Sequence, residues 1–272
     1  MTEILRYAAF SDDPKGGNPA GVVLDATGLS DERMLAIAAE VGYSETAFIT
    51  GRDEGGLRVR YFSPLAEVPF CGHATVATAV ALGPGDHVFR TNAGEVPVSV
   101  DDAGRATLTS VDPAVDDLDE AGRAALLAAL RWDAADLDES LPVKVAYAGA
   151  RHPVLAASSR RRLAALDYDF EALKTLMESR GWTTIQLVFR AGEDTFDVRD
   201  PFPVGGVYED PATGAAAAAF GGYLRALGIV GGDAVLHLRQ GDDLGRPSRI
   251  TVTLVPGEAG VRVSGQAVPI AG

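Results

Sequence analysis

The chain has 272 residues, of which 47% are hydrophobic and 23% are charged, a composition typical of a globular protein of one large or two ordinary domains. Its formal net charge of −14 argues against nucleic acid or an anionic membrane surface as partner, because both require a basic footprint. No apolar run is long enough to cross a bilayer, and Cys71, the only cysteine, cannot form a disulfide within the chain. With no signal-peptide pattern at the first residues, we expect a cytoplasmic protein.

The first half of the chain alternates strand patterns with two helix patterns. A helix over 31–41 is expected to begin after Ser30 and to end at Gly42. A second helix, over 74–82, is apolar on all sides, which predicts that a sheet surrounds it. Asn18 lies in a turn and is either a solvated residue or a ligand contact. Strands are expected at 4–10, 20–25, 43–49, 57–62, 86–91, 95–100 and 105–110.

The second half begins after an acidic, proline-containing stretch over 112–120, which we interpret as a solvated linker. Helices are expected over 121–132 and near 169–180, and an Ala-rich helix ends before Gly228. The arginines at 160–162 can hold a phosphate or form a solvated helix face, and the second reading is the commoner. Strands are expected at 143–148, 153–157, 184–190, 195–199, 234–239, 249–255 and 261–264.

The two halves repeat one order of features: a strand ending near proline, an acid, a glycine and a buried helix. This order predicts two similar halves with a cleft between them, into which each central helix points its N-terminus. Free N–H groups and the helix dipole would there hold a carboxylate without lysine or arginine. The repeated features are strand 57–62, Glu67 and Gly72 in one half, and strand 195–199, Asp210 and Gly214 in the other.

Known motifs for nucleotides and for a nucleophilic serine do not occur, and the four histidines show no spacing that suggests a metal. Glu45, His73 and Asp210 remain, each beside a turn at the inferred cleft. Carboxylates and a histidine suit general acid–base catalysis on carbon, with helix N–H groups stabilising the developing charge. Simpler roles stay open: a surface acid, a helix-capping partner and a turn residue, respectively. The residues alone predict an acid–base enzyme or a carboxylate binder.

Five motifs in order then match a known family. They are Asn-Pro-Ala-Gly-Val from Asn18, Ser-Glu-Thr-Ala-Phe from Ser44, Phe-Cys-Gly-His-Ala-Thr from Phe70, Glu-Asp-Pro-Ala-Thr-Gly from Glu209, and Gln240-Gly241 through Ser248. Over essentially its whole length the chain resembles the phenazine-biosynthesis PhzF-like isomerase family. The resemblance implies the α+β fold of diaminopimelate epimerase, with two pseudo-symmetric domains, each a curled mixed β-sheet around a central α-helix. The resemblance also implies that the protein needs no cofactor and that it forms a homodimer, as members commonly do.

The resemblance also implies roles for single residues. Glu45 would move a proton on carbon, and His73 and Asp210 would support and bind the substrate. The first half is expected to contain residues 1–113 together with the last strand, at about 258–272, and the second half to contain residues 114–257. The expected function is a cofactor-independent isomerase acting on a small carboxylated metabolite. Residues expected to bind substrate are Asn18, Ser44, Cys71, Gly72, Thr213, Gly214 and Ala215, with Gly72, Thr213 and Gly214 as backbone or hydroxyl donors to a carboxylate.

Two departures from related sequences leave alternatives open. Many members have Thr-Gly-Ser where this chain has Thr213-Gly214-Ala215, so one hydroxyl is missing. Cys71 stands where the related two-thiol epimerases keep one catalytic cysteine, but Thr213 takes the place of the second, which favours a lining role for Cys71. The alternatives are a non-catalytic carboxylate-binding or interaction protein on the same scaffold, and a one-thiol racemase using Cys71 with Glu45 or Asp210 as the opposite base.

Overall fold

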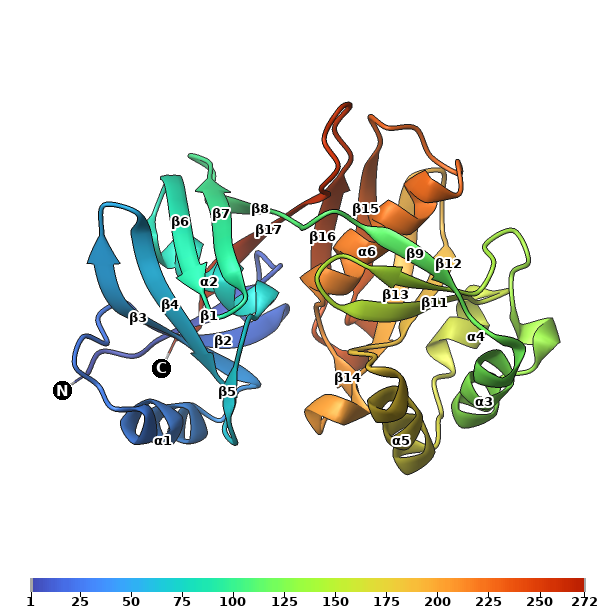
Figure 1. Ribbon diagram of the computed structural model, residues 1–272, viewed down its shortest axis with the longest axis horizontal. Coiled ribbons are helices and arrows are strands. Elements are labelled where there is room, and N and C mark those ends of the chain that lie inside the picture. Colours follow the sequence, from blue (N-terminus) through green and yellow to red (C-terminus); the bar gives the residue numbers. More distant parts are fainter. Residues whose placement is uncertain (1, 272) are drawn as a thin grey trace. The chain divides into compact units, whose positions relative to one another are not determined.

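The computed structural model describes residues 2–271, and the chain divides into two compact units. Unit 1 consists of Met1–Thr109 and Ser264–Gly272, and unit 2 of Ser110–Val263. The chain therefore leaves unit 1 once and returns to it with its last strand (Figure 1). Within the described range, no helix is long and apolar enough to span a membrane.

The strands of unit 1 form a closed ring. Pairing runs from β17 to β1, β2, β3, β4, β6, β7 and β8, and then from β8 back to β17; β5 is an additional short strand on β4. A closed ring leaves none of these eight strands at an open edge. The strands are β1 (Leu5–Ala9), β2 (Asn18–Val23), β3 (Glu45–Asp53), β4 (Gly56–Phe62), β5 (Glu67–Val68), β6 (Gly85–Thr91), β7 (Gly94–Val100), β8 (Arg105–Thr109) and β17 (Arg262–Pro269).

Helix α2 (Gly72–Leu82) is the central helix of unit 1, and every side chain from His73 to Ala79 is buried. The uniformly apolar pattern predicted this environment correctly, because such a helix has no face suited to water. Helix α1 (Asp31–Val41) packs outside the ring through Met34 and Ile37. It begins after the capping hydroxyl of Ser30 and ends at Gly42, whose φ of 71° favours glycine, as predicted.

Unit 2 places helix α6 (Gly214–Ala226) against a sheet in the order β9, β10, β11, β12, β13, β15 and β16, with β14 on β13. Helices α3, α4 and α5 enclose a second core that includes Trp132 and Trp182. The strands are β9 (Ala114–Asp117), β10 (Lys144–Tyr147), β11 (Arg151–Ala156), β12 (Gln186–Arg190), β13 (Thr195–Pro201), β14 (Glu209–Asp210), β15 (Val235–Gln240) and β16 (Ser248–Thr253). The helices are α3 (Glu120–Leu130), α4 (Arg160–Ala164) and α5 (Phe170–Arg180), with single 3-10 turns at Ala134–Asp136, Pro203–Gly205 and Asp242–Leu244.

The acidic stretch over 112–120 is not simply a linker. It contains strand β9, which pairs antiparallel with β10. Lys144 of β10 forms an ion pair with Asp117, and Arg151 of β11 lies 3.9 Å from Asp116. The acidic charge of this stretch argued against a strand in the sequence. Lys144 and Arg151 on the neighbouring strands offset that charge in the structure.

The two units repeat one topology. The succession β1, β2, β3, β4, β5, α2, β6, β7 in unit 1 matches β10, β11, β12, β13, β14, α6, β15, β16 in unit 2. In each succession, the second and third strands are parallel, as are the fourth strand and the strand after the central helix. The predicted α+β fold of two pseudo-symmetric halves, each with a sheet around a central helix, is confirmed.

The repeat corrects one predicted equivalence, that of Glu67 with Asp210. Glu67 opens β5 and binds Arg60 through both carboxylate oxygens, and Glu209 opens β14 and binds Arg199 in the same forked manner. The counterpart of Glu67 is therefore Glu209, one residue before Asp210. The acid–arginine fork fixes the short strand that leads to each central helix.

Candidate active site

Three reactive side chains meet in unit 1. The Sγ of Cys71 lies 3.6 Å from Oε2 of Glu45, and Nε2 of His73 lies 3.5 Å from the same oxygen. Cys71 Sγ is also 3.3 Å from Nδ1 and 3.8 Å from Nε2 of the His73 ring. Glu45 is the first residue of β3, whereas Cys71 and His73 flank the first residue of α2.

Two polar residues hold the His73 ring. The side-chain nitrogen of Asn18, at the start of β2, lies 3.2 Å from Nδ1, and the Ser44 hydroxyl lies 3.4 Å from Nε2. Asn18 is only 2% exposed, so it is not the solvated turn residue that its sequence context allowed. The structure therefore brings together, in one unit, five of the residues predicted for the site.

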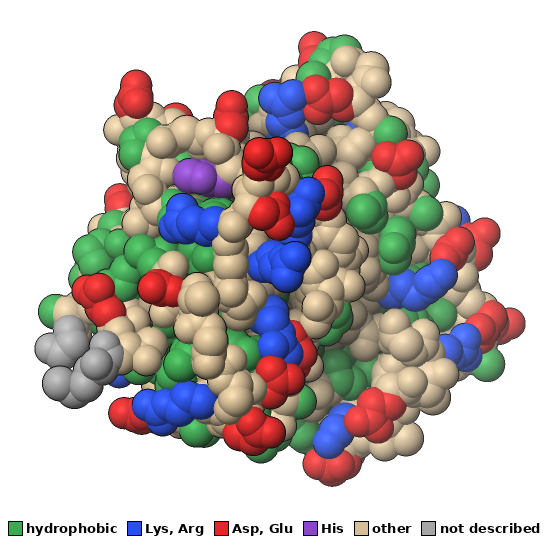
Figure 2. All heavy atoms as spheres, turned by 60° about the vertical axis from the view of Figure 1, so that its left-hand side comes forward, with side chains coloured by type: hydrophobic (Ala, Val, Ile, Leu, Met, Phe, Trp, Pro, Cys, Tyr) green, Lys and Arg blue, Asp and Glu red, His purple; other side chains and the backbone are tan. Residues whose placement is uncertain are grey.

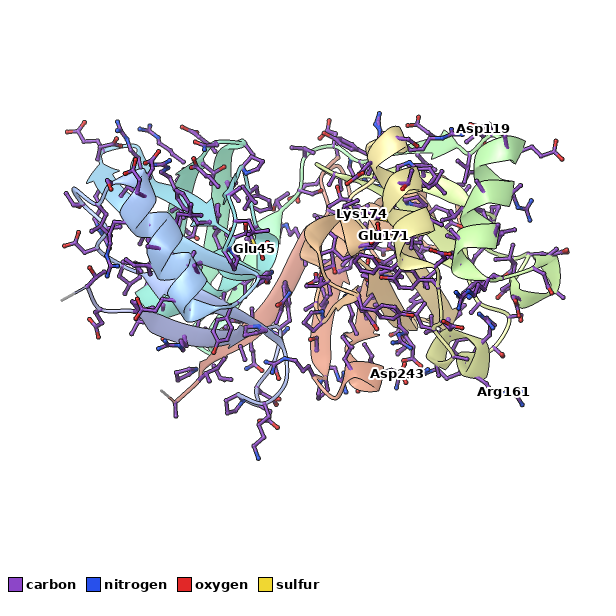
Figure 3. The ribbon with its side chains drawn as sticks, turned by 90° about the horizontal axis from the view of Figure 1, so that it is seen from below. Glu45, Asp119, Arg161, Glu171, Lys174 and Asp243 are labelled. Carbon is purple, nitrogen blue, oxygen red and sulfur yellow. The ribbon has the colours of Figure 1, made fainter. Side chains whose placement is uncertain are left out.

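Burial shapes the electrostatics of this cluster. The side chain of His73 is 7% exposed, and that of Glu45 is 15% exposed. Removal from water lowers the pKa of His73 below its ordinary value, and the neighbouring Glu45 carboxylate partly opposes that effect. The imidazole is therefore held neutral beside a carboxylate that keeps partial access to solvent (Glu45 is labelled in Figure 3).

The N-termini of the two central helices differ from those of the other helices. Helices α1, α3, α4 and α5 are each capped by the side chain of a serine or aspartate. In the part of the chain that the structure describes, the N-cap residues of α2 and α6, Cys71 and Thr213, make no such side-chain bond. The first N–H groups of α2 and α6, from Gly72 and Gly214 onward, thus remain without a side-chain cap, as an anion site requires.

In unit 2, Asp210 is held by the turn that leads into α6. The Thr213 hydroxyl donates to Oδ2 of Asp210 at 2.6 Å, and the Thr213 N–H donates to Oε1 of Gln240 at 3.0 Å. The Gln240 amide donates in turn to the Asp210 carbonyl at 2.7 Å. Both donors of Thr213 are used inside the protein, so the backbone N–H groups of Gly214 and Ala215 are the better candidates for binding a carboxylate.

Sequence reasoning missed a buried polar network behind Asp210. Asp200 faces Asp210 across the β13–β14 pair, accepts a hydrogen bond from the Thr184 hydroxyl at 2.9 Å and lies 2.9 Å from the Gln186 amide. Thr184 also contacts Nδ1 of the fully buried His152 at 2.8 Å. Burial raises the pKa of Asp200 well above its ordinary value, and the charges of Asp210 and Glu209 add to that rise. The available sequence signal was Asp200 itself, an acid at a position of β13 where the alternation of Phe196 and Val198 calls for a buried apolar residue.

The topological repeat shows what unit 2 carries in place of the reactive cluster. Glu45 opens β3, which is parallel to β2, and Gln186 opens β12, which is parallel to β11. The N-cap residues Cys71 and Thr213 correspond, and His73 then corresponds to Ala215. Each titratable group of the cluster thus has a non-titratable counterpart.

Two of the arginines at 160–162 have acidic neighbours, and Nε of Arg162 lies 3.7 Å from Oδ1 of Asp136. Arg160 lies 2.9 Å from both Asp197 and Asp243, and the guanidinium of Arg162 lies over the Trp132 ring. Arg161 points away from α4 (Figure 3). Figure 2 shows the same intermixing on another face, where blue and red side chains alternate. Arginines already paired with carboxylates have little charge left for a nucleic acid or a free phosphate.

Comparison with known proteins identifies the family of the chain. The family model "Phenazine biosynthesis-like protein" matches residues 7–272. The chain belongs to this family. It is 35% identical over 268 residues to the "Uncharacterized isomerase YddE" of Escherichia coli strain K12, an alignment covering 93% of this chain and 90% of the relative. It is 33% identical over 249 residues to the trans-2,3-dihydro-3-hydroxyanthranilate isomerase of Pseudomonas aeruginosa, covering 89% and 86%.

A crystal structure of a PhzF-family phenazine biosynthesis protein from Bacillus anthracis matches with a TM-score of 0.88 at 26% identity, covering 99% of this chain and 97% of the other. The phenazine biosynthesis-like family thus extends over both units, and the chain is an isomerase of the PhzF type. The spacing of the histidines in the sequence suggested no metal site. In the structure, however, Glu45, Cys71 and His73 each place one potential metal-ligand atom within 4.8 Å of the others.

Proposed function

We propose that this PhzF-like isomerase moves a proton on carbon of a small carboxylated metabolite, without a cofactor, and that Glu45 carries the proton. The main support is the one-sided distribution of reactive groups: Glu45, Cys71 and His73 correspond to Gln186, Thr213 and Ala215. A two-base racemase needs an acid and a base on opposite faces of one carbon. A single carboxyl suits removal of a proton from one carbon and its return to another on the same face.

The surroundings of Glu45 suit this role. The neutral His73 ring, held by Asn18 and Ser44, lies 3.5 Å from the carboxylate and would fix its orientation. The uncapped N-terminus of α2, which starts at Gly72, would bind the substrate carboxylate and stabilise negative charge that develops when the proton leaves carbon. In unit 2, Asp210 and the start of α6 would supply a second set of polar groups for binding substrate.

Proton transfer can be tested by incubating the enzyme with carboxylated cyclic dienes in deuterium oxide. The substrate named for the Pseudomonas aeruginosa relative, a dihydro-hydroxyanthranilate, is the first compound to try. We expect deuterium on carbon and a shifted double bond, and a loss of about 10²- to 10⁴-fold in rate for Glu45→Gln. Glu40→Gln, an exposed acid on α1, is the matched control and should keep the wild-type rate. Turnover by Glu45→Gln at the wild-type rate would refute the role of Glu45. If the wild type and both variants bind the carboxylated compound but none of them incorporates deuterium, the protein is instead a carboxylate-binding protein.

A one-thiol racemase is a second candidate, because Cys71 Sγ lies 3.3 Å from His73 Nδ1, an arrangement that can activate a thiol. The position of the deuterium separates the two mechanisms. Isomerisation places it on a different carbon and moves the double bond, whereas racemisation places it on the original carbon with inverted configuration. Nuclear magnetic resonance of the product reads this directly, and inversion that is lost in Cys71→Ala would favour the thiol mechanism.

A further inference from the structure

We propose that Glu45, Cys71 and His73 form a binding site for a divalent zinc ion, and that the ion switches the isomerase off by occupying Glu45. The site is defined by one ligand atom from each residue, and these atoms all lie within 4.8 Å of one another. Metal binding is argued from unit 1 alone and is independent of the reaction. Only the inhibition rests on the proposed function.

The spacing of the three atoms fits a tetrahedral ion. Zinc–sulfur bonds of about 2.3 Å and zinc–nitrogen or zinc–oxygen bonds of about 2.0–2.1 Å place tetrahedral ligand atoms about 3.3–3.6 Å apart. The separations in the protein are 3.6 Å from Sγ to Oε2, 3.5 Å from Oε2 to Nε2 and 3.8 Å from Sγ to Nε2. A contraction of a few tenths of an ångström would therefore complete three corners of the tetrahedron.

The chemistry of the three donors selects zinc over magnesium or calcium. One sulfur, one imidazole nitrogen and one carboxylate oxygen form a borderline-soft set, whereas the harder ions take oxygen ligands only. On binding, the Cys71 thiol loses its proton to solvent, and the thiolate and carboxylate together balance the charge of the ion. Three protein ligands leave the fourth position for water.

The surroundings supply the outer contacts that such a site needs. Coordination through Nε2 leaves the ring proton on Nδ1, where it requires an acceptor. The Asn18 side-chain nitrogen lies 3.2 Å from Nδ1, and a half-turn of the amide on zinc binding would place its oxygen there as the acceptor. Cys71 and His73 are 8% and 6% exposed, so the site is shielded on the side of α2 and remains open at the partly exposed Glu45.

Cobalt is the direct probe, because a tetrahedral cobalt–thiolate complex absorbs strongly in the visible and near ultraviolet. We expect the full-length protein to show this spectrum, and zinc to displace the cobalt. Cys71→Ser should lower the affinity for zinc by about 100-fold or more and abolish the thiolate band, and Glu45→Gln should weaken binding while keeping the band. His237→Gln, which alters an exposed histidine in β15, is the control and should bind as the wild type does.

The proposal is overturned if the wild type shows only the weak spectrum of octahedral cobalt, or if folded Cys71→Ser binds zinc as tightly as the wild type. Circular dichroism checks that each variant is folded. Zinc should also suppress deuterium exchange in the wild type at the concentration that saturates the cobalt competition. Metal binding without that suppression would retain the site but reject the inhibition, and a substrate that never exchanges would count against the proposed function alone.

Discussion

The Asp200 carboxyl is fully buried in unit 2, and its surroundings make ionisation costly. Its hydrogen-bond partner Thr184 favours the charged form, but burial and the nearby Asp210 and Glu209 outweigh that effect and raise its pKa well above 3.8. The folded protein thus keeps a proton on Asp200 at pH values where the unfolded chain has lost it. A neutral Asp200 places no second negative charge against Asp210 across the strand pair, which leaves the Asp210 carboxylate suited to its proposed role.

This proton uptake predicts a pH-dependent stability. Because folded Asp200 binds the proton more tightly, the free energy of unfolding falls as pH rises above about 3.8, by up to about 1.4 kcal/mol per pH unit until the folded pKa is reached. The side chain of Asp200→Asn is neutral at every pH, so this variant should lack the fall. Its stability relative to that of the wild type should therefore increase from pH 4 to pH 7. His152, whose pKa burial lowers to about 3, contributes the opposite slope in both proteins.

Urea unfolding followed by tryptophan fluorescence measures the difference in the free energy of unfolding between the two proteins, since both tryptophans lie in unit 2. Parallel profiles for the two proteins would contradict the prediction.

Most elements were predictable because their signals are local. Helix α1 follows from Ser30, an amphipathic stretch and Gly42, and the buried character of α2 follows from its uniform apolarity. Strand β9 was missed because its stability comes from Lys144 and Arg151 on other strands. The same limit applies to the site: motifs select Glu45 and His73, but only strand pairing and the start of α2 bring Cys71 to the Glu45 carboxylate. That Gln186 is the counterpart of Glu45 requires the register of two parallel pairs.

Helix α6 packs so closely in unit 2 that two of its glycines have no free space for a Cβ. A Cβ on Gly221 would lie 2.6 Å from Cγ1 of Val252, and one on Gly222 would lie 2.3 Å from Cβ of Pro113. The contact at Gly222 is with a rigid ring rather than the end of a flexible side chain. Close packing of this kind fixes the axis of α6 and, with it, the direction of its N–H groups at Gly214.

The helix therefore predicts an exception to the usual effect of replacing glycine. Alanine is favoured over glycine inside a helix by about 1 kcal/mol, but overpacking costs about 1–3 kcal/mol, and we expect Gly222→Ala to lose up to about 2 kcal/mol in net stability. Gly232→Ala is the control, because its Cβ would meet no heavy atom within 4 Å, and it should change stability by less than about 0.5 kcal/mol. Both are measured by urea unfolding, and a Gly222→Ala protein more stable than the wild type would show that Pro113 yields easily.

At the scale of the molecule, the two units differ in how the chain builds them. Unit 2 is one continuous segment, whereas unit 1 closes its ring only when β17 arrives from the far end of the chain. Beyond the pairing of β17 with β1 and β8, further contacts join the end of the chain to the rest of unit 1. The Phe10 N–H donates to the Gln266 carbonyl at 2.7 Å, the Ile270 N–H donates to the Arg6 carbonyl at 2.8 Å, and the hydroxyls of Thr107 and Ser264 lie 2.9 Å apart. Without β17, both β1 and β8 would become open edges, next to the scaffold that carries Glu45.

This asymmetry predicts which fragments fold by themselves. Residues 110–263 contain both tryptophans and the core around them, so the isolated segment should unfold cooperatively with the fluorescence change of the intact protein. Residues 1–109 lack β17 and should be poorly ordered or aggregate, because β1 and β8 each lose one of their two partner strands. Joining residue 109 to residues 264–272 through a short glycine-serine linker restores the missing strand and should restore a dispersed amide spectrum in nuclear magnetic resonance. A linked fragment carrying Gln266→Pro, which removes the N–H of a residue within β17 and restricts its backbone, is the control for strand pairing and should be less ordered than its parent. A well-folded 1–109 fragment without the linker would show that the ring does not depend on its last strand.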